Sequence, residues 1–335
     1  MNTPYQVTHI SVDEESAGQR LDNFLFRHLK GVPKTHVYRI IRSGEVRVNK
    51  GRASAESKLN AGDVLRLPPL RRAEESASTA QPHVPAREFP VLFEDESFLA
   101  IHKPAGVAVH GGSGVSSGVI EQLRQARPAA RCLELVHRLD RETSGVLLIA
   151  KKRSALRALQ DQFRERETGK TYLALVKGEW PSRQKVIDRA LQKYLLPDGE
   201  RRVRVVDADH PDAMRSITLV KVRAVVGDPC TLSAVKSTLR EATLLEVTIK
   251  TGRTHQIRVH LSQAGFPIAG DDKYGQFEWN RQLAKAGYPR MFLHAWKLEV
   301  KHPVTAESLR IMAPLPSELM GMLPAEVGGA LSDSQ

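Results

Sequence analysis

The chain has 335 residues, which is long enough for two domains of ordinary size with substantial cores. Hydrophobic residues make up 41% and charged residues 26%, as in ordinary soluble globular proteins. The longest apolar run, VLLIA at 146–150, is far shorter than the roughly 20 residues of a membrane-spanning helix. The polar N-terminus does not have the pattern of a signal peptide. We therefore expect a cytoplasmic protein without a membrane partner.

The charge balance is strongly basic. The 50 Lys and Arg residues against 38 Asp and Glu give a formal net charge of +12. Such an excess favours a polyanionic partner, and nucleic acid is the expected one for a cytoplasmic protein. The two cysteines, Cys132 and Cys230, lie far apart and in no metal-type spacing. This predicts reduced, buried residues instead of a disulfide or a metal site.

The first predicted domain covers residues 18–80, after an N-terminal tail at 1–17. Apolar residues at i, i+3, i+4 and i+8 from Leu21 mark one face of a helix. Pro33 can open a second helix, and Gly44 can close it. Two short strands should follow: the first ends in a turn at residues 49–51, and the second is entered through Gly62 and Asp63. The predicted strands are EVRVN at 45–49 and VLRL at 64–67.

This domain holds most of the excess charge. Residues 16–72 contain thirteen basic residues against four acids, which accounts for nine of the twelve excess positive charges. A solvated basic face would explain each cation singly, but their concentration in one small domain favours phosphate binding. The segment GVPKTHVYRIIRSGEVRVNKGR at 31–52 resembles the S4 RNA-binding domain, which implies RNA binding through the helix pair and the following strand. The RNA-binding residues expected here are Lys34, Arg39, Arg42, Arg47 and Lys50.

The second predicted domain covers residues 91–318, between a linker at 81–90 and a C-terminal tail at 319–335. Pro, Ser and charge replace any apolar period ahead of it, which is typical of a linker. Its strands and helices do not alternate as regular βαβ units, so we expect an α+β fold with a mixed, largely antiparallel sheet. The predicted strands are FLAIHK at 98–103, VLLIAKK at 146–152, TYLALVKG at 171–178, LLEVTIKT at 244–251 and LHAWKLEV at 293–300, and a predicted helix is SALRALQDQFRERE at 154–167.

Two stretches concentrate charge ahead of regular structure. HRLDRETSG at 137–145 places Asp140 between two arginines, where the carboxylate is either a turn device that accepts backbone N–H groups or a catalytic group. In TGRTHQIRVHLSQAG, Thr254 can cap a helix. Arg253, His255 and Arg258 crowd this strand-to-helix corner, where cations and N–H dipoles favour an anion. The histidines of this stretch have no third ligand nearby, so we expect no metal site.

A third stretch, GKTYLALVKGEW, places Tyr172 at the entrance to a strand, where packing is the simple interpretation. Together, HRLDRETSGVLLIAKK, KTYLALVKG and TGRTHQIRVHL are similar to the three signature segments of the pseudouridine synthases of the RluA type. The similarity runs from about Gly18 to Pro314. This family isomerises uridine in RNA to its C-glycoside. The resemblance implies that activity, no cofactor, and 23S rRNA or a large-subunit assembly intermediate as the partner, with a monomer as the default state.

The resemblance also implies roles for individual residues. Asp140 would be the nucleophile, attacking either the ribose C1′ or the uracil ring. Arg258 matches the arginine that pairs with this aspartate, and a charge-assisted, bidentate bond would keep the carboxylate ionised in a dry site. Tyr172 matches the tyrosine that stacks on the target base, and its phenol could also assist removal of the proton from C5.

Three further residues are expected to bind RNA around the target nucleotide. The target nucleotide must be flipped out of its stack to be reached. Arg138 matches the arginine proposed to enter the vacated space, whereas Arg253 and His255 would hold adjacent phosphates.

The sequence departs from the family pattern in two places, and two other functions stay open. His102 in IHKPAGV stands where the family usually has asparagine. Residues 206–242 are longer and less regular than the usual strand pair, and GDPCTLSAVKSTLRE within them looks like an insertion. The alternatives are an RNA-binding protein without activity and a nuclease that uses His137 or His255 as acid and base.

Overall fold

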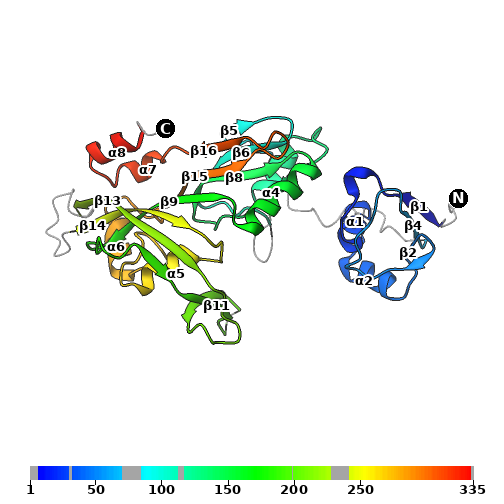
Figure 1. Cartoon of the computed structure of the whole chain (residues 1–335), viewed down its shortest axis with the longest axis horizontal. Coiled ribbons are helices and arrows are strands. Elements are labelled where there is room, and N and C mark those ends of the chain that lie inside the picture. Colours follow the sequence, from blue (N-terminus) through cyan, green and yellow to red (C-terminus); the bar gives the residue numbers. More distant parts are fainter. Residues whose placement is uncertain are drawn as a thin grey trace. The chain divides into compact units, whose positions relative to one another are not determined.

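The chain divides into two compact units, Met1–His83 and Val84–Gln335, each with its own buried core (Figure 1). The computed structural model describes residues 7–29, 32–69, 84–111, 117–197, 199–227 and 241–332. The boundary predicted at residue 80 lies outside these described residues. Phe89, within the predicted linker, is buried in the second unit's core, so that unit begins ahead of the predicted residue 91.

The first unit is a four-stranded antiparallel sheet, in the order β1-β4-β2-β3, with two helices packed around one apolar core. Both helices form where the apolar periodicity predicts them, and Leu21, Phe24 and Leu25 are buried as expected. The elements are β1 (Thr8–Ser11), a 3-10 helix η1 (Glu14–Ser16), α1 (Leu21–His28), α2 (Lys34–Arg42), β2 (Arg47–Val48), β3 (Gly51–Arg52) and β4 (Val64–Leu67).

The predicted N-terminal tail at 1–17 is wrong for residues 8–16. Strand β1 pairs with β4 from Thr8 to Ser11, and the Val12 side chain just after it is buried in the first unit's core. Four residues are too few to show an alternating pattern, and three of them are exposed, so the sequence carried no strand signal here.

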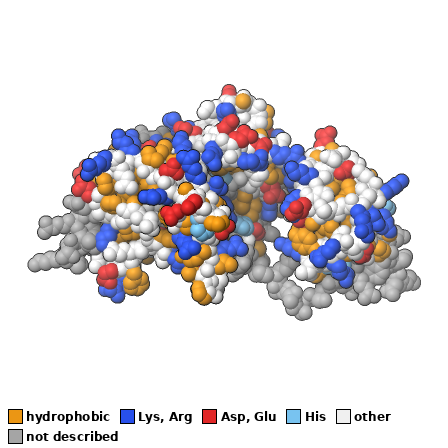
Figure 2. Space-filling view, turned by 60° about the horizontal axis from the view of Figure 1, so that its bottom comes forward, with side chains coloured by type: hydrophobic (Ala, Val, Ile, Leu, Met, Phe, Trp, Pro, Cys, Tyr) orange, Lys and Arg blue, Asp and Glu red, His pale blue; other side chains and the backbone are white. Residues whose placement is uncertain are grey.

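The basic residues of the first unit lie at its surface. Lys34, Arg39 and Arg42 are exposed on α2, as the spacing predicts. Asn49 and Lys50 both have positive φ angles, 48° and 67°, which is the conformation of a two-residue hairpin turn between β2 and β3. This turn places Lys50 at an exposed tip. Figure 2 shows Lys and Arg side chains on the faces of both units that it presents.

The second unit is built on a mixed sheet of ten strands, in the order β10-β13-β14-β9-β15-β8-β6-β5, with β16 added to β15 and β7 to β8. The β15–β8 pair is parallel and the other pairs are antiparallel, which confirms the predicted α+β class and sheet type. All five predicted strands form. The strands are β5 (Val91–Glu94), β6 (Phe98–Lys103), β7 (Glu134–Leu135), β8 (Ser144–Ala150), β9 (Gly169–Lys177), β10 (Val186–Asp188), β13 (Ile217–Gly227), β14 (Glu241–Ile249), β15 (Leu293–Lys301) and β16 (Ser308–Met312).

Helices and a separate hairpin complete the second unit. The predicted helix forms as α4, and its Ala155 and Leu159 side chains are buried. Strands β11 and β12 make a two-stranded sheet of their own, whose Leu191 and Val203 pack against Val259. The remaining elements are α3 (Val119–Ala126), α4 (Arg153–Glu165), β11 (Ala190–Leu195), β12 (Arg201–Val206), α5 (Gln256–Gln263), α6 (Phe277–Lys285), α7 (Ser317–Met320) and α8 (Ala325–Ser332).

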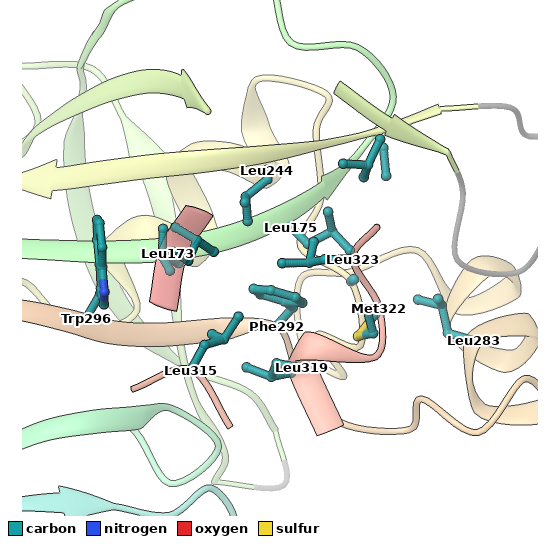
Figure 3. Close-up of a cluster of buried hydrophobic side chains, with 14 of the residues drawn as sticks. Leu173, Leu175, Leu244, Leu283, Phe292, Trp296, Leu315, Leu319, Met322 and Leu323 are labelled. Carbon is teal, nitrogen blue, oxygen red and sulfur yellow. The ribbon is translucent and has the colours of Figure 1, made fainter. Parts of the chain in front are cut away.

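The predicted C-terminal tail at 319–335 is also wrong. Leu319, Met322, Leu323 and Leu331 are buried in the same core cluster as Phe292. Figure 3 shows the first three of these side chains beside Phe292 and the strands of the main sheet. The apolar side chains lie in two short helices and the turn between them, too short a pattern to stand out in the sequence.

The predicted irregular segment at 206–242 is largely regular where it is described. Strand β13 pairs with β14 from Thr218 to Gly227, with a bulge between Val222 and Ala224. Residues 228–240 of the predicted insertion lie outside the described residues, as does Cys230. Cys132 is half-buried, not buried as predicted.

Candidate active site

Asp140 lies in the loop that joins β7 to β8, and one fifth of its side chain is exposed. The backbone makes a turn here, because the Thr143 N–H donates to the Asp140 carbonyl at 3.1 Å. The carboxylate takes no part in this turn. Among the described residues, its partners are the side chains of Arg258 and His255. The turn-device interpretation therefore applies to the backbone of Asp140 and leaves its carboxylate available for chemistry.

A buried lysine holds this loop in place. Lys103, at the end of β6, is fully buried and donates to three carbonyl oxygens: Pro104 at 2.8 Å, Val107 at 2.7 Å and Arg141 at 3.0 Å. Since Arg141 directly follows Asp140, the third bond ties the end of β6 to the loop that carries the carboxylate. Burial lowers the pKa of the Lys103 ammonium to about 7.

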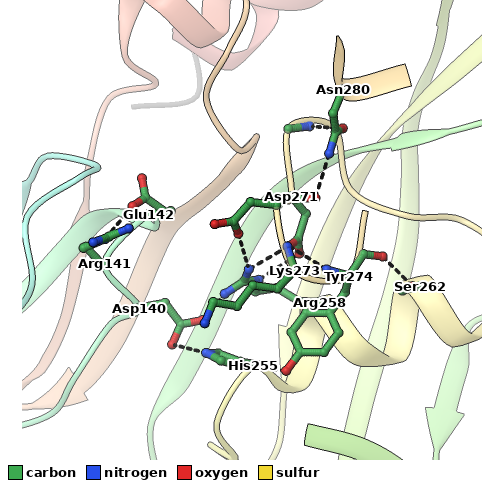
Figure 4. A network of polar contacts seen from close by, with 12 residues as sticks. Asp140, Arg141, Glu142, His255, Arg258, Ser262, Asp271, Lys273, Tyr274 and Asn280 are labelled. Atoms are coloured by element: carbon green, nitrogen blue, oxygen red, sulfur yellow. Dashed lines mark hydrogen bonds and ion pairs between the residues drawn. The ribbon is translucent and has the colours of Figure 1, made fainter. Parts of the chain in front are cut away.

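Arg258, on α5, is nearly fully buried and contacts three carboxylates (Figure 4). Its Nε and Nη2 atoms donate to the two oxygens of Asp271, at 2.8 and 2.6 Å. Its Nη1 atom reaches Asp140 Oδ2 at 3.5 Å, and its Nη2 atom lies 3.2 Å from Asp272 Oδ1. The predicted Arg258–Asp140 pair is present, but the bidentate partner is Asp271. Planar guanidinium geometry leaves one edge for Asp140 once Asp271 has taken the other.

His255 approaches Asp140 from the other side, with its Nε2 atom 3.9 Å from Oδ1. Its Nδ1 atom lies 2.8 Å from the Tyr274 hydroxyl, which accepts the Val203 N–H at 3.0 Å. Because the hydroxyl already accepts the Val203 N–H, we infer that it donates its own proton to Nδ1 and that the imidazole proton lies on Nε2, facing Asp140. Burial lowers the pKa of His255, and the negative charge of Asp140 opposes this shift.

The left-handed backbone of His255 sets this orientation. With a φ angle of 51°, His255 is the N-cap residue of α5, and its side chain does not bond to the helix. The predicted cap at Thr254 is therefore wrong by one residue. The Gln256 side chain accepts the Arg253 N–H at 3.1 Å, which closes the corner in place of a threonine cap. As a result, the imidazole points at Asp140, with 13% of its side chain exposed.

Tyr172 lies on β9, between Val247 of β14 and Ala295 of β15 in the sheet. It is half-buried and lines the same pocket as Asp140. Burial, together with the charge of Asp140, raises the pKa of the Tyr172 phenol well above its usual range. A protonated phenol cannot accept a proton, so the groups around Tyr172 favour a stacking role.

One pocket brings the three predicted stretches together. Asp140, Tyr172 and Arg258 line it, although Asp140 and Arg258 are 118 residues apart in the sequence. The other described lining residues include three of the predicted RNA-binding residues and an apolar wall. These are Arg138, Arg253 and His255, and Leu139, Ile249, Ile257 and Leu293.

Comparison with known proteins agrees with this geometry. A family model for RNA pseudouridylate synthase matches residues 97–263, and one for the S4 domain matches residues 19–65. Ribosomal large subunit pseudouridine synthase C of Pasteurella multocida (strain Pm70) is 50% identical over 322 residues, covering 95% of this chain and 94% of that protein. The chain belongs to the RNA pseudouridylate synthase family. It is a pseudouridine synthase with an S4 domain in its first unit.

Two further proteins support this assignment. Ribosomal large subunit pseudouridine synthase C of Escherichia coli (strain K12) is 51% identical over 311 residues, covering 91% of this chain and 92% of that protein. The solved structure of human RNA pseudouridylate synthase domain containing 1 is 25% identical, with a TM-score of 0.56. The aligned region covers 73% of this chain and 95% of the human chain.

The predicted RNA-binding residues of the S4 domain stay predictions, but their surroundings suit the role. Lys34, Arg39, Arg42 and Lys50 are exposed and Arg47 is half-buried. Within the described residues, none of the five forms an ion pair, whereas Arg20 of the same domain pairs with Asp22 and Glu56. These five cations are therefore open to phosphate groups.

Sequence reasoning missed three residues of this pseudouridine synthase's site: Lys103, Asp271 and Tyr274. Lys103 could have been found as a lysine at the end of an otherwise apolar strand, FLAIHK. Asp271 and Tyr274 stand in GDDKYG, where two consecutive acids in a basic chain were the available signal.

Several other predictions can be compared with the structure. His102, at the position where the family usually has asparagine, packs edge-on against His294 with ring centres 5.4 Å apart. His137 accepts the Leu148 N–H and stacks on Phe163, and burial lowers its pKa to about 4, so it does not suit a nuclease's acid and base.

In the described part of the chain, no cluster of three or more His, Cys, Asp or Glu side chains could hold a metal ion. None of the described helices is long and apolar enough to span a membrane.

Proposed function

We propose that this pseudouridine synthase acts on uridines of large-subunit ribosomal RNA, with Asp140 as the nucleophile. The observation that carries the proposal is the convergence of Asp140, Arg258 and Tyr172 in one pocket. Relatives whose names give ribosomal large subunit as their substrate cover more than nine tenths of the chain. The exposed cations of the S4 domain suit a large structured RNA.

The reaction rearranges a single nucleotide. The bond between uracil N1 and ribose C1′ breaks, the uracil turns, and C5 of the ring forms the new bond to C1′. The proton that leaves C5 is balanced by the one that N1 receives. Asp140 attacks either C1′ or the uracil ring, and both routes require an ionised carboxylate. Arg258 and His255 both face that carboxylate, with Nη1 of Arg258 at 3.5 Å and Nε2 of His255 at 3.9 Å.

The pocket wall supports the same chemistry. Leu139, Ile249, Ile257 and Leu293 present apolar side chains that would exclude water from the detached uracil. Tyr172 would stack on the ring, because its phenol stays protonated beside Asp140.

Two exposed arginines would hold the RNA. The target nucleotide must leave its stack, at a cost of a few kcal/mol. Arg138 is exposed and lines the pocket, which suits entry into the vacated space. Arg253 would bind a phosphate. We assign His255 to the orientation of Asp140 in place of phosphate binding, because its ring is directed at that carboxylate and bonded to Tyr274.

Carbodiimide labelling with primer extension on ribosomal RNA tests the proposal. RNA from a strain that lacks the gene should lose labelling stops at specific large-subunit uridines, and the wild-type enzyme should restore them. Asp140→Asn should restore none and still bind RNA. Glu142→Gln, which removes a carboxylate of the same loop that pairs at the surface with Arg141, should restore them. Unchanged stops in the deletion strain would contradict the proposed substrate.

A further inference from the structure

A second pocket adjoins the active pocket and is unusually rich in positive charge. It lies between the C-terminal end of α4, the start of β9 and the end of β14. None of the described residues that line it carries a carboxylate. Its cationic lining residues are Arg138, Arg164, Arg166, Lys170, Lys250 and Arg253. One of these cations, Arg164, is paired outside the pocket, with Asp161.

Lys170 differs from the other cations of this pocket because it is buried. It is 8% exposed, and its ammonium donates to the Thr168 hydroxyl at 3.1 Å and lies 5.4 Å from the centre of the Phe163 ring. In the part of the chain that the structure describes, it has no acidic partner. Burial lowers the pKa of Lys170, and the positive charges of Arg166 and Lys250 lower it further.

This arrangement costs stability in the free protein. A buried ammonium is normally paired with an acid, because burial without a counter-charge is unfavourable. The ring and the hydroxyl offset part of that cost, but they do not explain why Arg166 and Lys250 stand nearby. An anion bound among the three would remove both the burial cost and the repulsion.

The pocket is continuous with the place where the target base would sit. Five residues line both pockets: Arg138, Tyr172, Ile249, Gly252 and Arg253. Lys170 and Tyr172 are two residues apart on β9, so their side chains share one face of the strand, about 7 Å apart along it. Any anion held by Lys170 is therefore a near neighbour of a base stacked on Tyr172.

We propose that this pocket binds a backbone phosphate of the RNA segment next to the target uridine, with Lys170, Arg166 and Lys250 as its cations. The proposal rests on the proposed function, since it takes the occupant of the active pocket to be a uridine of an RNA strand. The stacked His137 and Phe163 rings form part of its wall, 4.7 Å apart. Phosphate binding here would anchor the strand while the uracil is detached and turned.

Single-phosphate replacement tests the assignment. The probe is an RNA oligonucleotide around a uridine identified by carbodiimide labelling, with one phosphate at a time replaced by an uncharged methylphosphonate. With the wild-type enzyme, replacement at one linkage beside the target should weaken binding by about tenfold, the usual loss for one charge-assisted contact. With Lys170→Gln, binding should be weaker throughout, and the same replacement should cause a much smaller further loss, because only Arg166 and Lys250 remain.

Matched variants separate this role from a general charge effect. Lys285→Gln removes an equal charge from an exposed position on α6 and should keep the full sensitivity to that linkage. Lys170→Arg should retain most of it. Arg166→Asn should behave like Lys170→Gln, and asparagine tolerates the left-handed backbone of that residue, whose φ angle is 64°.

Thermal melting without RNA separates binding from a structural role. Because Lys170 is a buried charge with no acidic partner among the described residues, Lys170→Gln should melt at or above the wild-type temperature. A lower melting temperature together with unchanged linkage sensitivity would overturn the pocket proposal. So would equal losses at every linkage in wild type and Lys170→Gln while the wild-type enzyme still isomerises the RNA. If the wild-type enzyme failed to isomerise ribosomal RNA, that result would contradict the proposed function itself, and the pocket proposal would lose its basis.

Discussion

Arg258 gives its bidentate contact to Asp271, at 2.6 and 2.8 Å, and a single 3.5 Å contact to Asp140. Asp271 also accepts the N–H groups of Lys273 and Tyr274, which fixes its carboxylate in the loop after α5. The guanidinium is thus oriented before substrate arrives, and the edge facing Asp140 is held ready. Burial alone would raise the pKa of Asp271, but the bonds from Arg258 lower it below its usual range.

Asp271→Asn should therefore damage both stability and activity. It leaves Arg258 buried without its main counter-charge, a loss of about 3–5 kcal/mol in comparable pairs. Isomerisation should fall because the guanidinium is no longer held toward Asp140. Asp272→Asn is the matched control, since that carboxylate is 60% exposed and should contribute less than about 1 kcal/mol. Urea unfolding and single-turnover isomerisation would measure the difference, and equal effects of the two variants would contradict this account.

Tyr274→Phe should leave the imidazole of His255 without one fixed tautomer. The substitution removes the hydroxyl that bonds His255 Nδ1 and leaves the Val203 N–H unpaired, at a cost of about 1–3 kcal/mol. Nitrogen NMR should place the His255 proton on Nε2 in the wild type and on both nitrogens in the variant. Isomerisation should fall while RNA affinity stays the same.

Tyr194→Phe is the matched control for this prediction, because Tyr194 lies on β11, outside the active pocket. It should leave the His255 spectrum and the isomerisation rate unchanged. A wild-type proton on Nδ1 would show that His255 donates to the Tyr274 hydroxyl, the reverse of the direction assigned to this bond.

The parts of the fold that sequence could predict are those with a repeating apolar pattern. The helix face that starts at Leu21 and the buried strand FLAIHK are long enough for the period to stand out. Strand β1 and helix α7 were missed because each is only four residues long. The position of such a short element depends on the core residues against which it packs, and a local sequence pattern does not contain that information.

The site divides in the same way. Asp140, Tyr172 and Arg258 stand in long, distinctive segments, so their convergence could be expected. The pairing of Arg258 with Asp271 could not be expected from the sequence, because a loop carboxylate pairs with whichever cation the folded chain brings to it. Lys103 was missed because a lysine is almost never fully buried, and only the three carbonyls around it make this possible.

Acid should destabilise the second unit through His294. This fully buried imidazole lies between the Ser144 hydroxyl and the Ala313 carbonyl, and burial lowers its pKa from about 6.5 to about 3. Between these values the unfolded chain binds a proton that the folded chain does not. Stability is therefore lost as the pH falls from about 6.5 toward 3, by about 1.4 kcal/mol per pH unit for this group.

His294→Gln should remove that contribution. Urea unfolding of the wild type between pH 6 and pH 4.5 should show a steep fall in the free energy of unfolding, and the variant should show a shallower one. The variant will be less stable at pH 7, so the slope against pH is the quantity to compare. Parallel slopes would mean that His294 is already protonated in the folded protein.

The S4 domain should account for much of the salt dependence of RNA binding. Lys34, Arg39 and Arg42 are exposed on α2 without ion pairs in the described residues, so each is available to one phosphate. Replacing all three with glutamine should lower the slope of log affinity against log salt by about 2–3, since each phosphate contact releases close to one counterion. The fold should be kept, because none of the three side chains is part of the buried core.

A control with equal charge loss distinguishes a binding surface from a general effect of net charge. Lys185, Lys221 and Lys285 are exposed in the second unit and line neither the active pocket nor the basic pocket beside it. Their triple glutamine variant should keep nearly the wild-type slope. If both triple variants lowered the slope equally, RNA would be attracted by the total charge of the protein, and α2 would have no special part in binding.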